Sequence, residues 1–211
     1  MNTRHAAGLP ILAMAGAMAV SLSGTGSAAL ASPRHADTAA SGVSWAAAAQ
    51  PMTARRPFGP GCSAVPRTGK GSFAGMAADP VATAASHNPA LSTLVAAVQK
   101  AGLTDTLNGA GGITVFAPTN QAFAKIPKKT LAKVLADKKT LTAILTHHVV
   151  AGRKTPADLR RGRFATLQGG TVATRGSGTT YKVNNARVVC GNVATRNATV
   201  YIIDTVLMPT R

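Results

Sequence analysis

The chain has 211 residues, of which 45% are apolar, so it can bury the core of one ordinary domain. It carries 23 Lys and Arg against six acidic residues, and all six are scattered Asp, which leaves no obvious carboxylate pair for acid–base catalysis. The formal charge of +17 favours anionic partners such as acidic polysaccharides, teichoic-type polymers, phospholipid headgroups or nucleic acid. The alternative is a compositional bias of the genome, because net charge bears on association and not on fold.

Residues 1–31 are predicted to form a signal peptide. Arg4 and His5 give it a basic start, residues 11–22 an apolar stretch, and the small residues around Ala29 a cleavage site. The apolar stretch is well short of the roughly 20 residues that span a bilayer, and we expect no transmembrane segment after signal removal. No Cys lies near the cleavage site to carry a bacterial lipid anchor. We therefore expect a secreted protein, or one loosely associated with the cell envelope.

Residues 32–57 are rich in Ala, Ser, Pro and Arg without sustained periodicity, which predicts a disordered linker before a domain spanning 58–211. Cys62 and Cys190 are the only cysteines, and export favours a disulfide between them. An unpaired, reactive thiol is the alternative. A zinc site is disfavoured because two isolated thiols lack the CxxC spacing.

From residue 79 to about 162 the sequence signals are mainly helical. Asp79 and Asn88 each precede a Pro and are predicted N-caps. After Asn88 the apolar residues fall on one helix face, and Gly102 follows as a stop. Asp137 is expected to cap a further helix whose inner face is apolar.

The pattern changes after Arg163. Residues 113–116 already form a short β-rich run, and residues 164–208 contain strand-like segments separated by Gly and Asn turns. Among them, residues 171–175 alternate between the two faces of a strand. Helices followed by strands, with no regular βαβ alternation, predict an α+β fold rather than a doubly wound parallel sheet.

Three ordered segments resemble the successive signatures of the fasciclin (FAS1) family: residues 114–123 (TVFAPTNQAF), 145–150 (LTHHVV) and 196–209 (RNATVYIIDTVLMP). The start at residues 58–62 and the late Cys190 further resemble the secreted fasciclin-domain antigens of mycobacteria and other actinobacteria. The resemblance implies a single-domain β-wedge of two packed sheets flanked by several short helices. It also implies an exported protein with a role in adhesion or matrix contact.

The signature residues have a structural interpretation of their own. Phe116 is expected to pack inward, Thr119 or Asn120 to cap the next helix, and Asp204 to satisfy nearby backbone donors. The signature positions, all interpreted as mainly structural, are Phe116, Pro118, Thr119, Asn120, Phe123, His148, Asn197, Asp204 and Pro209.

A basic segment is the candidate binding surface, because residues 125–163 contain eleven Lys and Arg but only two Asp. With the apolar residues of the helices turned inward, the cations must lie on outer faces, where Arg can hold phosphate or carboxylate in bidentate fashion. The alternative is a solvated helical face without a ligand. The candidate residues are Lys125, Lys128, Lys129, Lys133, Lys138, Lys139, Arg153, Lys154, Arg160, Arg161 and Arg163.

Catalytic signals are weak. No Gly-x-Ser-x-Gly turn exposes a nucleophile. His147 and His148 are adjacent, so on a strand they would point to opposite sides and could not easily share a metal. We expect one of them to be buried and hydrogen-bonded and the other exposed. No catalytic residue, metal site or cofactor is predicted.

The sequence thus predicts a secreted, monomeric fasciclin-domain protein that acts in binding or adhesion. The expected partner is an extracellular protein or an anionic polysaccharide or cell-wall polymer. Nucleic acid is a weaker candidate, because the basic segment lacks interleaved aromatic residues for base stacking. The alternatives are a structural envelope protein without a specific ligand and, third, an uncharacterised enzyme.

Overall fold

The computed structural model describes residues 56–209, so the predicted signal peptide and nearly all of the predicted linker lie outside the described residues. Within this range no helix combines the length and the apolar character needed to cross a membrane. The helices are η2 (Pro60–Ala64), α1 (Phe73–Ala78), α2 (Val81–Ser86), η3 (Pro89–Leu91), α3 (Ser92–Ala101), α4 (Thr104–Gly109), α5 (Asn120–Ala124), α6 (Lys128–Ala136), α7 (Lys138–His147) and η4 (Asp158–Arg160). The strands are β1 (Ile113–Pro118), β2 (Val149–Ala151), β3 (Arg161–Ala165), β4 (Thr171–Ser177), β5 (Thr180–Val183), β6 (Ala186–Ala194) and β7 (Ala198–Ile203).

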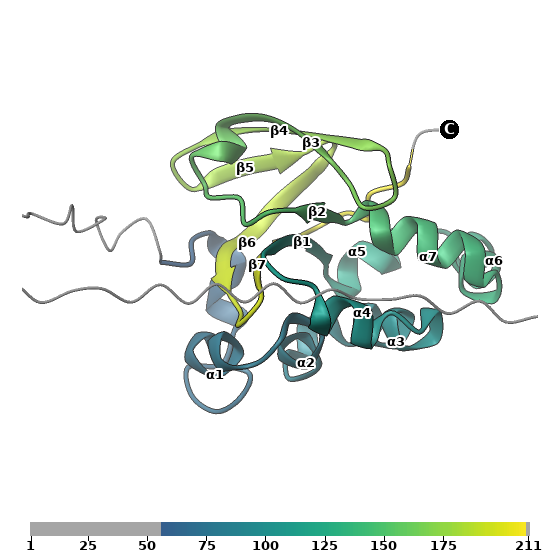
Figure 1. The fold of residues 1–211 in the computed structure, drawn as a ribbon, viewed down its shortest axis with the longest axis horizontal. Helices are drawn as coiled ribbons and strands as arrows, with labels where there is room; N and C mark the ends of the chain where they lie inside the picture. The colour runs from purple at the N-terminus through teal and green to yellow at the C-terminus, as the bar shows by residue number, and fades with distance from the viewer. Residues whose placement is uncertain (1–55, 210–211) are drawn as a thin grey trace, which may run out of the picture. The chain divides into compact units, whose positions relative to one another are not determined.

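The seven strands form one continuous sheet in the order β2-β1-β7-β6-β5-β4-β3. Strands β1 and β7 are parallel and all other neighbours are antiparallel. Strand β6 pairs with β5 through its first residues and with β7 along the rest, so it joins a first half (β2, β1, β7) to a second half (β5, β4, β3). Figure 1 shows helices α1 to α4 on the side of the first half that faces away from β3, β4 and β5. The predicted α+β wedge is confirmed, and its two sheets are the two halves of one sheet.

Two hydrophobic clusters lie on opposite faces of the first half. Because successive side chains of a strand point to opposite faces, Val115 of β1 packs with the helices while Phe116 faces the second half. Phe116 is joined there by Tyr201 of β7 and by Val172 and Val183 of the second half. Strands β1 and β7 are consequently buried along their whole length.

Several predicted helix ends are confirmed. Asn88 caps η3, and its Oδ1 accepts the Ala90 N–H at 3.0 Å. Gly102 ends α3 in the left-handed conformation, with φ 73°. Asp137 begins α7, and its Oδ1 accepts the Lys139 N–H at 2.9 Å.

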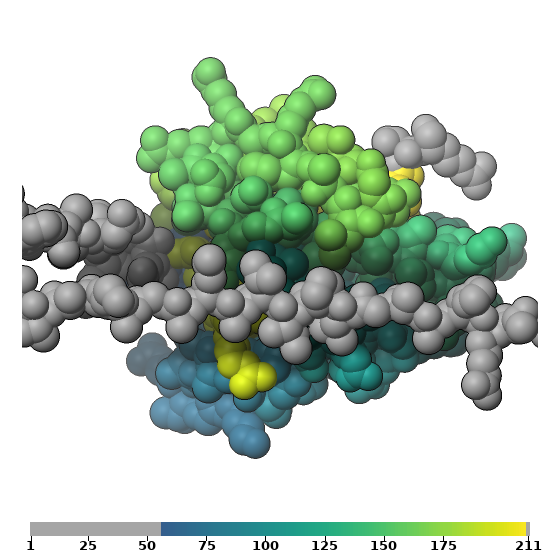
Figure 2. Space-filling model, viewed as in Figure 1, coloured from purple at the N-terminus to yellow at the C-terminus, as the bar shows by residue number. Residues whose placement is uncertain are grey.

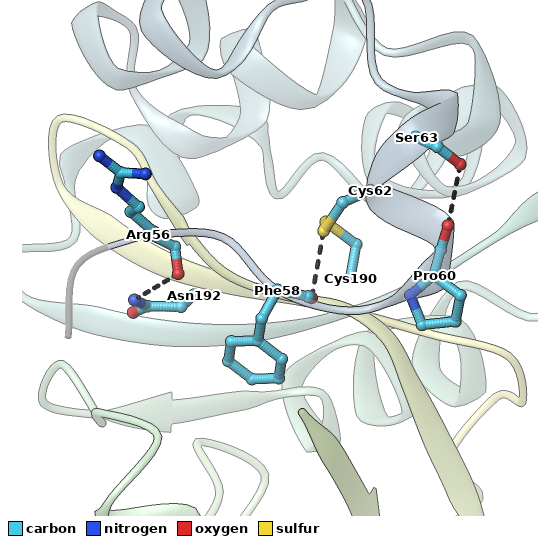
Figure 3. Close-up of a disulfide and its surroundings, with 7 residues drawn as sticks. All are labelled: Arg56, Phe58, Pro60, Cys62, Ser63, Cys190 and Asn192. Carbon is cyan, nitrogen blue, oxygen red and sulfur yellow. Dashed lines mark hydrogen bonds between the residues drawn. A yellow bond between two sulfur atoms is a disulfide. The ribbon is translucent and has the colours of Figure 1, made fainter. Parts of the chain in front are cut away.

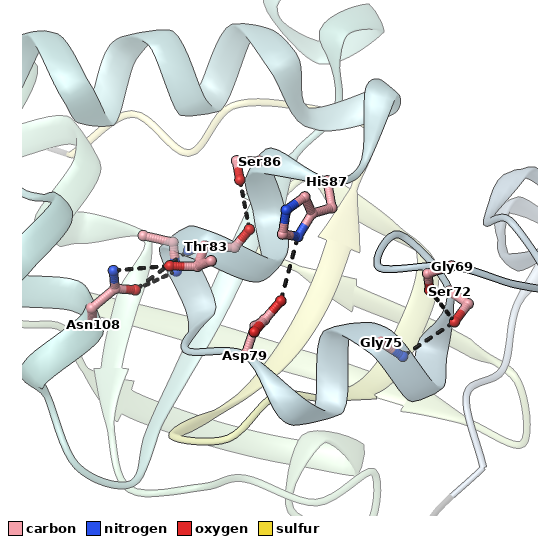
Figure 4. Close-up of polar contacts among 9 residues, drawn as sticks. Gly69, Ser72, Gly75, Asp79, Thr83, Ser86, His87 and Asn108 are labelled. Atoms are coloured by element: carbon pink, nitrogen blue, oxygen red, sulfur yellow. Dashed lines mark hydrogen bonds and ion pairs between the residues drawn. The ribbon is translucent and has the colours of Figure 1, made fainter.

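The predicted N-cap role of Asp79 is wrong. Its carboxylate lies 3.4 Å from Nδ1 of His87, as Figure 4 shows, and makes no side-chain cap for α2. The first two N–H groups of α2 instead donate to side chains distant in sequence. Asn197 Oδ1 accepts from the Val81 N–H at 2.8 Å, and Asn108 Oδ1 accepts from the following residue at 3.0 Å.

The predicted boundary between helices and strands is also corrected. Strand β2 lies at Val149–Ala151, inside the stretch predicted as mainly helical. Strand β3 begins at Arg161, three residues before residue 164, where the strand-like pattern is predicted to begin. Both strands are short, and β3 is exposed at alternate positions, so neither has the apolar run that marks a buried strand in sequence.

The segment before α1 is fixed onto β6, as Figure 3 shows. Cys62 and Cys190 form a disulfide that joins positions 128 residues apart, with their Cα atoms 4.8 Å from each other. Phe58 and Gly191 exchange two backbone hydrogen bonds of 3.1 and 2.8 Å. A Cβ at Gly191 would lie 2.5 Å from the Phe58 ring, so this close approach requires glycine.

Candidate functional site

The signature residue Asn197 holds the helical layer against the end of the sheet. Its Oδ1 accepts the Val81 N–H at 2.8 Å, and its Nδ2 donates to the carbonyls of Leu107 and Ala110, both at 2.7 Å. A third carbonyl, that of Asn108, lies 3.2 Å from the same nitrogen. The amide therefore has its partners inside the fold, and its role is structural.

Asn120 makes a similar connection at the other end of β1. Its Oδ1 accepts the Thr93 N–H at 2.9 Å, while its Nδ2 donates to the Pro89 carbonyl at 2.9 Å and to the Ser92 hydroxyl at 3.0 Å. The preceding Thr119 is the N-cap of α5. These side chains connect α3 to the turn that follows β1, and their polar atoms are occupied by hydrogen bonds within the fold.

Asp204 joins the end of β7 to two other segments. Its Oδ1 accepts the Arg187 N–H at 2.8 Å, and its Oδ2 lies 3.3 Å from the Lys125 ammonium. Burial opposes ionisation of this carboxyl, but hydrogen bonds from Arg187, Thr205 and Lys125 outweigh burial and lower its pKa. Lys125, a candidate binding residue, is thus engaged in an ion pair.

Both histidines are buried, which corrects the expectation that one is exposed. They lie at the C-terminal end of α7, not on a strand, and each is 2% exposed. His147 Nδ1 lies 3.3 Å from the Thr166 hydroxyl in the loop after β3. Burial lowers the pKa of His147, opposed by a hydrogen bond with Gln168.

His148 has backbone partners at both ring nitrogens. Nε2 accepts the Leu207 N–H at 2.9 Å, and Nδ1 therefore carries the proton that it donates to the Ile144 carbonyl at 2.8 Å. Burial lowers the pKa of this ring to about 4. A neutral ring with both nitrogens occupied links α7 to the C-terminal segment and offers no free base.

Five of the predicted binding residues lie on the helices α6 and α7, and all five are exposed. The nearest acid in sequence, Asp137, separates the two helices and uses its carboxylate to cap α7 and to bind the Thr140 hydroxyl. These hydrogen bonds lower the pKa of the Asp137 carboxyl, and the one from the Thr140 hydroxyl has the largest effect. The exposed lysines are Lys128, Lys129, Lys133, Lys138 and Lys139.

The other predicted binding residues lie elsewhere. Arg153 donates to the backbone carbonyls of Thr195 and Arg196 before β7 and of the first β7 residue, at 2.6 to 3.1 Å. Lys154 Nζ lies 5.2 Å from the centroid of the Phe164 ring. Arg160 belongs to η4, and Arg161 and Arg163 to strand β3, and all three are exposed. The structure therefore divides the predicted basic residues between the α6 and α7 helices, the second half of the sheet, and two residues, Lys125 and Arg153, whose charged groups are engaged within the fold near β7.

An apolar cavity of about 190 Å³ lies between helices α2 to α4 and strands β1 and β7. Its walls are mainly apolar, and they include Asn88, whose buried Nδ2 has no hydrogen-bond partner among the described residues. His148 also contributes to the wall, but both of its nitrogens are occupied. At the helical wall of the cavity, the Thr83 hydroxyl accepts a hydrogen bond from Asn108 Nδ2, and the Ser86 hydroxyl donates to the Thr83 carbonyl (Figure 4).

Residues 89–209 match the family model of the fasciclin domain. The chain belongs to the fasciclin family. The cell surface glycolipoprotein MPB83 of Mycobacterium bovis is 50% identical over 186 residues, covering 84% of this chain and 83% of that protein. The immunogenic protein MPB70 of the same species is 50% identical over 171 residues, covering 77% of this chain and 88% of that protein. The resemblance to mycobacterial fasciclin-domain antigens is confirmed.

Among solved structures, a FAS1 domain pair from the insect cell adhesion molecule fasciclin I has a TM-score of 0.48 at 25% identity. That match covers 57% of this chain and 45% of the insect chain, so it spans less than half of that chain's length. Neither the description of the fasciclin domain nor the names of these antigens denote an enzyme. Within residues 56–209, no group of three or more His, Cys, Asp or Glu could hold a metal ion.

Proposed function

We propose that this fasciclin protein is a binding or adhesion module at the cell surface that contacts anionic polymers of the envelope through α6 and α7. Two observations support its place outside the cytoplasm: the export signal predicted at residues 1–31, and 50% identity to a protein named as a cell surface glycolipoprotein. In this proposal the linker at 32–57 separates the signal peptide from a monomeric domain at 58–211.

The observation that carries the proposal is the concentration of unpaired positive charge on α6 and α7. The lysines of the two helices are exposed and make no ion pair within residues 56–209. Each lysine is a flexible point charge that contributes little alone, so affinity must come from several contacts to one polymer. Binding of this kind weakens as salt rises, because the charges are exposed to solvent.

Binding of the full chain to purified acidic cell-wall polymers, at low and at physiological salt, tests the proposal. A variant with Lys128, Lys129, Lys138 and Lys139 changed to Gln should bind more weakly at low salt. A matched variant with the same four positions changed to Arg keeps the charge and should bind at least as well as the unmodified protein. Equal binding by the Gln variant, or no binding at low salt, would contradict the proposal.

A further inference from the structure

Four cationic residues lie directly opposite one another across the second half of the sheet. Arg161 of β3 lies opposite Arg175 of β4. Arg175 in turn lies opposite Lys182 of β5, and Lys182 lies opposite Arg187 of β6. We call these four residues the cationic row. Three of them, Arg175, Lys182 and Arg187, lie outside the basic segment that the sequence indicates.

The cationic row lies on the outer face of the sheet. On β5, Tyr181 and Val183 point into the core, so Lys182 between them points outward. The same alternation turns Val172 and Thr174 of β4 inward and leaves Arg175 exposed. Figure 2 shows this layer as the green part of the surface, from which long side chains project into solvent.

Nothing within the described part of the chain neutralises the row. Residues 161–194 contain no Asp or Glu, and the side chains of the four cations make no ion pair or hydrogen bond in the range 56–209. One acid, Asp204, reaches the Arg187 end, where it binds the backbone N–H and pairs with Lys125. Like charges directly opposite each other on adjacent strands, about 5 Å apart at Cβ, destabilise a sheet.

We propose that the cationic row binds one linear, acidic polysaccharide, laid across the strands so that successive carboxylate or phosphate groups each face one cation. This inference rests on the proposed function for the class of partner, but it assigns that partner to a different surface. Adjacent strands lie about 4.8 Å apart, so the sheet presents charges at a regular spacing over about 15 Å. A linear polymer with one charge about every 5 Å matches such a spacing, and its binding removes the repulsion along the row.

The chemistry of the row favours a carbohydrate over nucleic acid. Its three arginines are planar forks that bind carboxylate or phosphate with two hydrogen bonds each. The aromatic residues of these strands, Phe164 and Tyr181, pack with the core on the other face and offer no stacking surface for bases. Because the arginine fork is pre-organised, less side-chain freedom is lost per hydrogen bond in the row than at the flexible lysines of α6 and α7.

Binding of short and long acidic glycans to the full chain tests the proposal. Tetragalacturonate and a phosphodiester-linked hexose tetramer distinguish carboxylate from phosphate, and polygalacturonate is the long probe. In the row variant, Arg161, Arg175, Lys182 and Arg187 become Gln. The helix variant has Gln at Lys128, Lys129, Lys138 and Lys139, so both variants lose the same charge.

We expect the row variant to lose about tenfold or more of its affinity for at least one tetramer at low salt, and the helix variant to retain its affinity for it. Unchanged tetramer binding by the row variant would overturn the inference, as would tighter binding of a single-stranded DNA tetramer. If the helix variant alone loses polygalacturonate binding, the proposed function stands without the row. Melting of both variants at or above the unmodified protein's temperature excludes loss of folding as the cause.

Discussion

In the first half of the sheet, β1 and β7 are buried on both faces, whereas β3, β4 and β5 bury one face and leave the other in water. The polar signature residues around the first half, such as Asn197 and Asn120, direct their side chains at backbone groups of neighbouring segments. The outer face of the second half instead carries cations without partners among the described residues.

The difference separates scaffold from candidate binding surface. The family signatures describe the buried half, where polar groups complete the fold. The four side chains of the cationic row make no ion pair or hydrogen bond within residues 56–209 that would favour folding, and Arg175 and Lys182 repel each other. Substitutions around the first half should therefore cost stability, and substitutions on the outer face of the second half should change binding and leave the fold intact.

The largest expected effect is loss of the disulfide that fixes the N-terminal segment to β6. With the two half-cystines 128 positions apart in sequence, the Cys62→Ser, Cys190→Ser double variant should lose roughly 4 to 5 kcal/mol of unfolding free energy. The melting temperature should fall by roughly 10 to 20 °C, measured by circular dichroism. Reducing agent added to the unmodified protein is the matched control and should lower the melting temperature similarly. An unchanged melt in both cases would contradict a stabilising disulfide.

The second effect concerns the polar network of the first half. Asn197→Ala removes the acceptor of the Val81 N–H and the donor to three carbonyls, and we expect a loss of about 3 kcal/mol in denaturant unfolding. Asn185→Ala, in the exposed turn before β6, is the matched control and should change stability by less than about 0.5 kcal/mol. Equal effects of the two substitutions would remove the distinction between scaffold and surface.

The sequence predicts those parts of the fold that depend on near neighbours. The stop at Gly102 and the caps at Thr119 and Asp137 involve residues within a few positions, and all are found. Asp79 was predicted as a cap because it precedes a Pro. The acceptor that α2 uses instead comes from Asn197, 116 residues away, which no local pattern reveals.

The cationic row could not be predicted for a related reason. The alternation of residues 171–175 indicates that Arg175 faces one side of its strand, but only the register of two strand pairs, β3–β4 and β4–β5, brings it opposite Arg161 and Lys182. A shift of one residue in any pair would turn a cation to the other face. The alternation within a single strand can be recognised in the sequence. The pairing between strands, which places the cations side by side on one surface, cannot.

The third effect depends on pH. Burial lowers the pKa of His148 from 6.5 to about 4, so the folded protein keeps a neutral ring that the unfolded chain protonates below about pH 6.5. The free energy of unfolding should therefore fall as pH drops from about 6.5 to about 4, by about 3 kcal/mol in total. His148→Gln cannot ionise and should lose most of that slope, while the buried His147 keeps its own contribution. Parallel pH profiles for the two proteins would contradict this assignment.

The smallest effect tests the second half and has the opposite sign. Arg175 lies between two cationic cross-strand partners, so Arg175→Gln should raise the unfolding free energy by about 0.5 kcal/mol at low salt. The gain should vanish at high salt, because screening removes the repulsion on which it depends. Lys70→Gln, in an exposed turn before α1, removes the same charge away from the row and should give no gain. A gain that persists at high salt would point to strand propensity as its cause. A loss at low salt would mean that Arg175 supports the fold, so that the outer face of the second half is scaffold as well.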